Sequence, residues 1–217
     1  MRYTSLLILW LLCPPLIVMS QPEQTNDKDL YVFYLHGAIV QQQGENAISN
    51  TYGRYMYRAI VDSLKRNGLH VISEVRPQDA TLDSYSGKVA IQLDSLLQSG
   101  IPPQHITVIG ASAGAAMTLE VAMFTGNRQV NYALMGICSD NSPRRYQQKK
   151  ICGNFFSVYE SSDGAGSCKD LLFNRSCVSG FKELKLNMGN GHGFLYQPYK
   201  EWLQPMVQWI YESSKRQ

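Results

Sequence analysis

One stretch of the chain restricts its possible folds more than any other, because three kinds of segment meet there. His105 to Ile109 is a β-branched, apolar run typical of a strand, and the residues after Ser112 are good helix formers. Between them lies a group of small residues, Gly110-Ala111-Ser112-Ala113-Gly114. A G-x-S-x-G pattern between a strand and a helix predicts a sharp turn that raises the serine hydroxyl above the edge of a sheet. The two glycines are expected where neighbouring backbone leaves no room for a side chain.

Strand and helix patterns alternate along the rest of the chain. Short apolar runs predict six strands, at Leu30 to Leu35, Leu69 to Val75, His105 to Ile109, Val130 to Ile137, Asn154 to Tyr159 and Glu183 to Met188. Apolar stripes with helical spacing predict helices around 56–64 and 89–97, after Ser112 to about Phe124, and around 199–210. This alternation predicts an α/β fold, a doubly wound and mostly parallel sheet of about six strands with helices on both faces.

The loops that follow the strands of such a sheet share one edge, where ligands bind. Four of these loops carry residues of chemical interest. They hold His36-Gly37-Ala38 after the first strand, Ser112 after the central one, Asp163 after the penultimate one and His192 after the last. The fold therefore predicts that a serine, a carboxylate and two histidines converge on one edge.

With these residues the chain resembles the α/β-hydrolase family from Tyr31 to Ile210. The likeness rests on the His36-Gly37 pair, the serine turn at 110–114, an acid after a late strand, and Gly191-His192-Gly193-Phe194 near the end. The order serine, acid, histidine is the one found in that family. Two early antiparallel strands of the family are missing, and Ser139 to Lys150 is too short for an inserted lid. The resemblance implies a small, lidless member.

The resemblance also implies a role for each residue. Ser112 would be the nucleophile, His192 the general base, and Asp163 the group that orients His192. A serine hydroxyl is a weak nucleophile until an imidazole, held in one tautomer by a third group, accepts its proton. The backbone N–H groups of Ala113 and Ala38 would form the oxyanion hole. No metal and no organic cofactor is implied, and no cysteine or histidine spacing suggests zinc.

Three acidic residues follow late predicted strands and could orient His192. Glu160 and Asp163 both follow the same predicted strand, and Asp140 follows the strand before it. Family members often place a few residues between this strand and the acid, which favours Asp163. Gly164 comes next and permits a tight turn that aims the carboxylate inward. Asp140 and Glu160 remain alternatives.

The first 20 residues read as a secretory signal peptide, followed by an α/β-hydrolase domain at 21–217. Arg2 supplies the positive start, and Leu6 to Leu12 is apolar throughout. Pro14 and Pro15 interrupt that apolar run, which is too short for a membrane span. The sequence therefore predicts a secreted or periplasmic protein without stable membrane insertion.

Four cysteines lie beyond the signal peptide, and an even number in an exported chain favours disulfides. Four cysteines allow three pairings. Because loop closure favours partners that are close in the chain, we expect Cys138 to pair with Cys152 and Cys168 with Cys177.

Together these features predict a serine hydrolase, most simply a carboxylic ester hydrolase that acts on a small-molecule ester or acyl substrate through an acyl-enzyme. A thioesterase, a lipase or a peptidase on the same scaffold is an alternative, because the three residues do not fix the leaving group. A catalytically silent binding module is the alternative of another class. The net charge of +3 gives no argument for nucleic acid, and the sequence does not indicate an oligomeric state.

Overall fold

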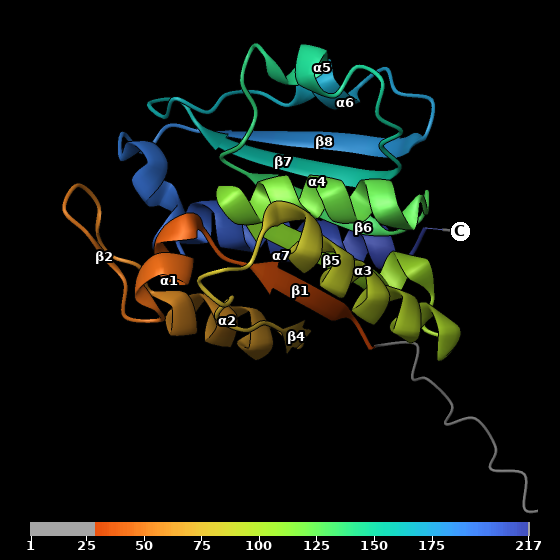
Figure 1. Cartoon of the computed structure of the whole chain (residues 1–217), viewed down its shortest axis with the longest axis horizontal. Coiled ribbons are helices and arrows are strands. Elements are labelled where there is room, and N and C mark those ends of the chain that lie inside the picture. The colour runs from red at the N-terminus through yellow and green to blue at the C-terminus, as the bar shows by residue number, and fades with distance from the viewer. Residues whose placement is uncertain (1–28, 217) are drawn as a thin grey trace, which may run out of the picture.

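A parallel sheet of six strands forms the centre of the computed structural model, which describes residues 29–216 (Figure 1). The strands lie in the order β4-β1-β5-β6-β7-β8, and each neighbouring pair is parallel. Their bounds are Tyr31–Leu35 for β1, His70–Ile72 for β4, Ile106–Ala111 for β5, Asn131–Met135 for β6, Gly153–Glu160 for β7 and Val178–Leu186 for β8. The predicted α/β fold is therefore confirmed.

Helices cover both faces of the sheet and create two apolar cores. One face carries α3 (Leu82–Gln98) and α4 (Ala113–Thr125), which lie side by side in front of the sheet in Figure 1. The other face carries α2 (Tyr57–Arg66) and α7 (Lys200–Ser214). Because side chains alternate along a strand, Val108 enters the first core and Ile109 the second.

Several short elements connect this framework. They are α1 (Ala38–Gln43), the hairpin of β2 (Ile48–Ser49) and β3 (Gly53–Arg54), the 3-10 turns η1 (Pro103–His105) and η2 (Gly191–Leu195), α5 (Ser142–Arg145) and α6 (Lys169–Leu172). The sequence did not indicate them, because segments of two to six residues are too short to show a periodic pattern. Strand β8 also begins at Val178, ahead of the expected Glu183. It forms an edge of the sheet and is only partly covered, so its early residues lack an apolar run.

The predicted disulfide pairing is wrong. The structure joins Cys138 to Cys168 and Cys152 to Cys177, with Cα atoms 5.2 and 4.5 Å apart. Cys138 follows β6 and therefore lies at the edge where the strands end, whereas Cys152 precedes β7 and lies at the edge where they begin. A strand of about five residues separates these edges by about 16 Å, too far for a disulfide. The parallel arrangement thus pairs each cysteine with the one at its own edge.

Removing the bridge at the edge where the strands begin is expected to destabilise the fold without touching the opposite edge. The double variant Cys152→Ala, Cys177→Ala should lose about 3 kcal/mol of unfolding free energy, because the bridge no longer restricts the unfolded chain. Urea denaturation measures this loss. Peptide mapping of the unreduced protein should find Cys152 linked to Cys177, and a peptide linking Cys152 to Cys138 would contradict the structure.

The two disulfides are consistent with an extracellular or periplasmic location. Among the helices of residues 29–216, none is long and apolar enough to cross a lipid bilayer. The predicted signal peptide at 1–20 lies outside the described residues, so its assignment stays a prediction.

Candidate active site

Ser112 occupies a strained turn between β5 and α4. Its backbone φ angle is 53°, and no other residue apart from glycine has a positive φ in the part of the chain that the structure describes. The left-handed region disfavours a residue with a Cβ atom, so the surrounding structure must hold this conformation. The N–H of Ser112 donates to the carbonyl oxygen of Met135 at 2.8 Å, which ties the turn to the end of β6.

The glycines on either side of Ser112 permit this turn to pack closely. A Cβ atom on Gly114 would overlap the carbonyl oxygen of Leu35 at the end of β1, and one on Gly110 would overlap the carbonyl oxygen of Gly114. Both positions are therefore closed to any side chain, as the G-x-S-x-G pattern predicted. The result is a serine carried on the shortest possible connection between β5 and α4.

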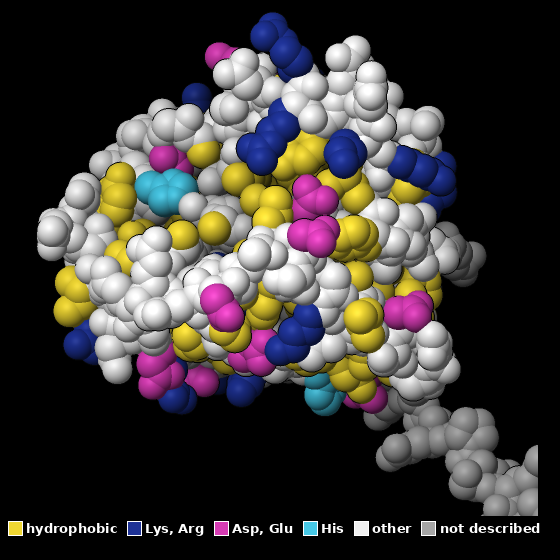
Figure 2. Space-filling model, in the orientation of Figure 1, with side chains coloured by type: hydrophobic (Ala, Val, Ile, Leu, Met, Phe, Trp, Pro, Cys, Tyr) yellow, Lys and Arg dark blue, Asp and Glu magenta, His cyan; other side chains and the backbone are white. Residues whose placement is uncertain are grey.

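His192 and Asp163 form a hydrogen-bonded pair at the same edge of the sheet. His192 lies in η2, after the last strand, and its Nδ1 is 2.7 Å from Oδ2 of Asp163 in the loop after β7. The Asp163 side chain is 8% exposed and that of His192 27%, so the carboxylate is shielded while the ring remains accessible. Figure 2 shows a histidine at the surface near this edge, with an acidic side chain beside it.

The histidine ring lies beside the end of β6, the strand that neighbours β5 and the serine turn. A Cβ atom on Gly136, the residue after β6, would be 3.3 Å from Cε1 of His192. Ser112 is hydrogen-bonded to the residue before Gly136. No hydrogen bond joins Ser112 Oγ to His192 among those of the described residues. Catalytic hydrogen bonds of this kind are often long or poorly aligned in a structure without substrate and tighten only when the substrate binds.

Glu160, an alternative for the acid, has a different position. Its carboxylate is fully buried at the end of β7 and accepts hydrogen bonds from both loops that carry the site. The donors are the hydroxyls of Ser161 and Ser162 and the backbone N–H groups of Ser162, Met188 and Gly189. Burial by itself raises the pKa of Glu160, but these hydrogen bonds outweigh it and hold the pKa below its usual value.

Through these bonds Glu160 joins the loop of Asp163 to the loop of His192. The hydroxyl of Ser162 completes the connection, because it also accepts the N–H of Gly191, next to the histidine. Sequence reasoning did not find this role, since it depends on hydrogen bonds between segments about 30 residues apart. The one available signal was an acidic residue at the end of an otherwise apolar strand.

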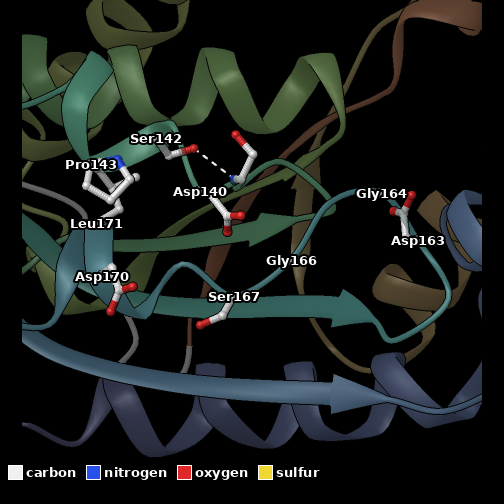
Figure 3. A pocket seen from close by; sticks show the side chains of 10 residues that line it. Asp140, Ser142, Pro143, Asp163, Gly164, Gly166, Ser167, Asp170 and Leu171 are labelled. Atoms are coloured by element: carbon white, nitrogen blue, oxygen red, sulfur yellow. Dashed lines mark hydrogen bonds between the residues drawn. The ribbon is translucent and has the colours of Figure 1, made fainter.

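Asp140, the other alternative, lines a pocket of about 240 Å³ between the segment after β6 and the loop after β7. Figure 3 shows Asp140 apart from Asp163, with Ser167 and Asp170 along the same pocket. Asp140 is exposed, and its side chain makes no hydrogen bond to His192 among the described residues. The structure therefore pairs Asp163 with the histidine and leaves Asp140 on the pocket wall.

The two N–H groups predicted for an oxyanion hole come from helix starts on either side of Ser112. Ala113 is the first residue of α4, and Ala38 is the first residue of α1. The N–H groups of a first helical turn have no acceptor within the helix, so they are available to a ligand. Gly37, the residue before Ala38, lies against the serine, because a Cβ atom on Gly37 would be 3.8 Å from Cβ of Ser112.

His36 holds the turn after β1 that carries the N–H of Ala38. Its Nε2 accepts the backbone N–H of Arg76 at 3.0 Å, so the ring proton resides on Nδ1, which lies 2.9 Å from the carbonyl oxygen of Gly37. The ring is fully buried and meets Tyr57 edge-on. Burial, and next the positive charge of Arg76, lower the pKa of His36 to about 4.

Acid is expected to destabilise the protein through His36. The unfolded chain protonates this histidine near its ordinary pKa of 6.5, whereas the folded protein resists protonation down to about pH 4. The unfolded state therefore binds more protons between these values, and stability falls as the pH falls. His36 should account for a loss of about 3 kcal/mol from pH 6.5 to pH 4.

Urea denaturation across that pH range measures the effect, with His36→Gln as the control. The variant lacks the imidazole. Its total loss of unfolding free energy between pH 6.5 and pH 4 should therefore be smaller than that of the wild type by about 3 kcal/mol. Parallel curves for the two proteins would show that His36 does not titrate as described.

The structure offers no evident metal site, since the described residues contain no group of three or more His, Cys, Asp or Glu side chains suited to one. The chemistry available at this edge is that of a serine hydroxyl, an imidazole bound to a carboxylate, and two backbone N–H groups.

Comparison with known proteins places this arrangement in a known fold. No protein-family model matches the chain, and no curated protein sequence matches it. Solved structures do. An arylesterase has a TM-score of 0.57 at 14% identity, covering 86% of this chain and 75% of its own. SOBER1 of Arabidopsis thaliana has a TM-score of 0.56 at 12% identity, covering 86% and 100%. The esterase Pf2001 of Pyrococcus furiosus has a TM-score of 0.54 at 14% identity, covering 85% and 83%. The chain thus has the α/β-hydrolase fold.

Proposed function

We propose that this protein is a serine hydrolase that cleaves carboxylic esters through an acyl-enzyme. The observation that carries the proposal is the arrangement of Ser112, His192 and Asp163 at one edge of the sheet. Ser112 stands on a strained turn, and the accessible imidazole of His192 is bound at 2.7 Å to a shielded carboxylate. The esterases among the similar structures support the same reaction class.

In the first half of the reaction, Oγ of Ser112 attacks the carbonyl carbon of the ester while His192 takes the hydroxyl proton. Asp163 accepts a hydrogen bond from Nδ1–H of the ring, so Nε2 is the basic atom. The negative charge of Asp163 also stabilises the imidazolium that forms. The carbonyl oxygen becomes an oxyanion, to which the N–H groups of Ala113 and Ala38 donate. The bond to the alcohol then breaks, and His192 returns the proton to the leaving oxygen.

The second half of the reaction repeats these steps with water. His192 removes a proton from the water as its oxygen attacks the acyl carbon, and a second oxyanion forms in the same hole. The bond to Oγ of Ser112 breaks, the serine recovers its proton, and the carboxylic acid leaves. No group beyond water and the residues named is needed to balance the reaction.

We further propose that the site is open, without a lid. The segment after β6 contains only the four-residue helix α5. The guanidinium of Arg175 holds this segment down, because it donates to the carbonyl oxygens of Tyr146 at 2.7 Å and Lys149 at 2.6 Å. A segment fixed in this way is a poor candidate for the movement that opens a lipase site.

Hydrolysis of p-nitrophenyl esters of graded acyl length tests both proposals. The protein should release p-nitrophenol from short, soluble esters with a hyperbolic dependence on concentration. A rate that rises sharply when the ester exceeds its solubility would indicate a lid and a lipase. If matched thioesters react and oxygen esters do not, the protein is a thioesterase. If no acyl substrate reacts, the proposed hydrolase function is wrong and a catalytically silent binding module is favoured.

A further inference from the structure

We propose that Arg76 is a positioning residue for the oxyanion site, which fixes and polarises the peptide bond that presents the N–H of Ala38. The inference rests on the proposed hydrolase function and deepens it, by assigning a role to a buried charge beneath the site. Arg76 follows the predicted strand at Leu69 to Val75, at the edge of the sheet where ligands bind.

Arg76 is a buried cation with unusual partners. Its side chain is 1% exposed, and the ion pairs among residues 29–216 do not include it. Nη2 donates to the carbonyl oxygen of Gly37 at 3.3 Å, Nε donates to Oε1 of Gln41 at 3.2 Å, and the guanidinium faces the ring of Tyr85 at 5.5 Å. Nη1 is buried without a hydrogen-bond partner.

A buried charge without a carboxylate partner costs stability. Neutral carbonyl and amide oxygens compensate only part of the lost hydration, and the unpaired Nη1 adds to the cost. An apolar side chain of similar length would fill the same space without this penalty. The presence of arginine here therefore calls for a reason other than packing.

The carbonyl oxygen of Gly37 provides that reason, because it receives two donors. One is Nδ1–H of His36 at 2.9 Å and the other is the charged guanidinium of Arg76. The oxygen belongs to the same planar peptide unit as the N–H of Ala38. Hydrogen bonds that draw electron density toward the oxygen leave the N–H more positive, as in any polarised chain of hydrogen bonds.

The same contacts fix the direction of that N–H. The backbone N–H of Arg76 anchors the ring of His36, and the side chain of Arg76 binds the residue that lies against Ser112. The peptide is thus held from one side by the segment that follows β4. Its N–H belongs to Ala38, the residue after Gly37, and a Cβ atom on Gly37 would lie 3.8 Å from Cβ of Ser112.

A more positive, fixed N–H interacts more strongly with an oxyanion than with a neutral ester carbonyl. The contribution of Arg76 should therefore appear in the transition state and hardly at all in substrate binding. This expectation separates Arg76 from a merely structural residue, whose loss would lower stability or the fraction of folded protein.

The test replaces Arg76 by methionine and measures kcat and KM for a soluble p-nitrophenyl ester, normalised to titrated active sites. It also measures the affinity for a trifluoromethyl ketone, which forms an oxyanion adduct with a catalytic serine. Loss of a whole oxyanion donor costs about 10²–10³ in kcat, so weakening one should cost about 10- to 100-fold. KM should stay nearly constant, and affinity for the ketone should fall by the same factor as kcat.

Arg76→Lys keeps the charge without the planar fork and should recover part of both losses. It also decides the matter if the methionine variant fails to fold. Arg216→Met is the matched control. Arg216 is half-buried, donates to Oδ1 of Asn131 at 2.9 Å, and lies at the edge where the strands begin. This variant should leave kcat and ketone affinity unchanged.

Two results would overturn the inference and can be told apart. If the wild-type protein hydrolyses no ester and binds no ketone, the proposed function fails and the role of Arg76 fails with it. If the wild-type protein is active and Arg76→Met retains its kcat and ketone affinity, only the role of Arg76 is wrong.

Discussion

Replacing Ser112 by alanine is expected to lower kcat for ester hydrolysis about 10⁶-fold, because the nucleophile and its base act as a unit. The substitution removes one oxygen from a half-buried side chain. It keeps the Cβ atom, and hence the same backbone preference at φ 53°. The folded structure should therefore survive, with a thermal midpoint close to that of the wild type. Steady-state kinetics and thermal denaturation measure the two quantities.

Ser139→Ala is a matched control, because Ser139 lies at the same edge of the sheet and lines the pocket beside Asp140. Its side chain has no part in the proposed mechanism, so activity should remain. If Ser112→Ala kept activity within about tenfold of the wild type, the assignment of the nucleophile would be wrong.

Replacing Asp163 by asparagine should lower kcat about 10⁴-fold. Asparagine has the shape of aspartate but can present its amide nitrogen to Nδ1 of His192, which favours the tautomer with its proton on Nε2. The ring could then no longer accept the proton of Ser112. The loss of negative charge would also destabilise the imidazolium that forms during attack.

Asp140→Asn tests the alternative acid under the same conditions. Asp140 is exposed on the pocket wall and has no part in the proposed mechanism, so its loss should change kcat little. If Asp140→Asn proved more damaging than Asp163→Asn, the pairing of Asp163 with His192 would not describe the working enzyme.

The sequence predicted those parts of the structure that depend on local patterns. The turn at Ser112 was predictable because glycine, alanine and serine are the residues that fit between β5 and the start of α4. The order of strands and helices followed from apolar runs and stripes. The convergence of Asp163 and His192 followed from the rule that the loops after parallel strands share one edge.

The disulfide pairing depends on the topology of the sheet and not on loop length alone. Loop length favoured Cys138 with Cys152, but topology decides, because these residues lie at opposite edges of the sheet. The predicted fold already contained this information, since the strands were expected to be mostly parallel. Two cysteines at opposite edges cannot form a bond, whereas lengthening a loop costs only a fraction of a kcal/mol in closure entropy. The position of each cysteine at an edge of the sheet therefore decides the pairing.

Glu160 and Arg76 could not be assigned from the sequence, because their roles depend on buried hydrogen bonds between distant segments. Glu160 joins two loops by accepting N–H groups from the second one, and Arg76 reaches a carbonyl 39 residues earlier. Single-sequence patterns report periodicity and local turns, and they carry no signal for such contacts.

The most direct test of the proposed function is the reaction of the native protein with a fluorophosphonate. Oγ of Ser112 should attack phosphorus and displace fluoride, and the site should be found by mass spectrometry of the digested protein. We predict one adduct per chain, on Ser112, that is absent from the heat-denatured protein and from Ser112→Ala. A folded protein that stays unlabelled, or one labelled at another residue, would contradict the proposal that Ser112 is an activated nucleophile.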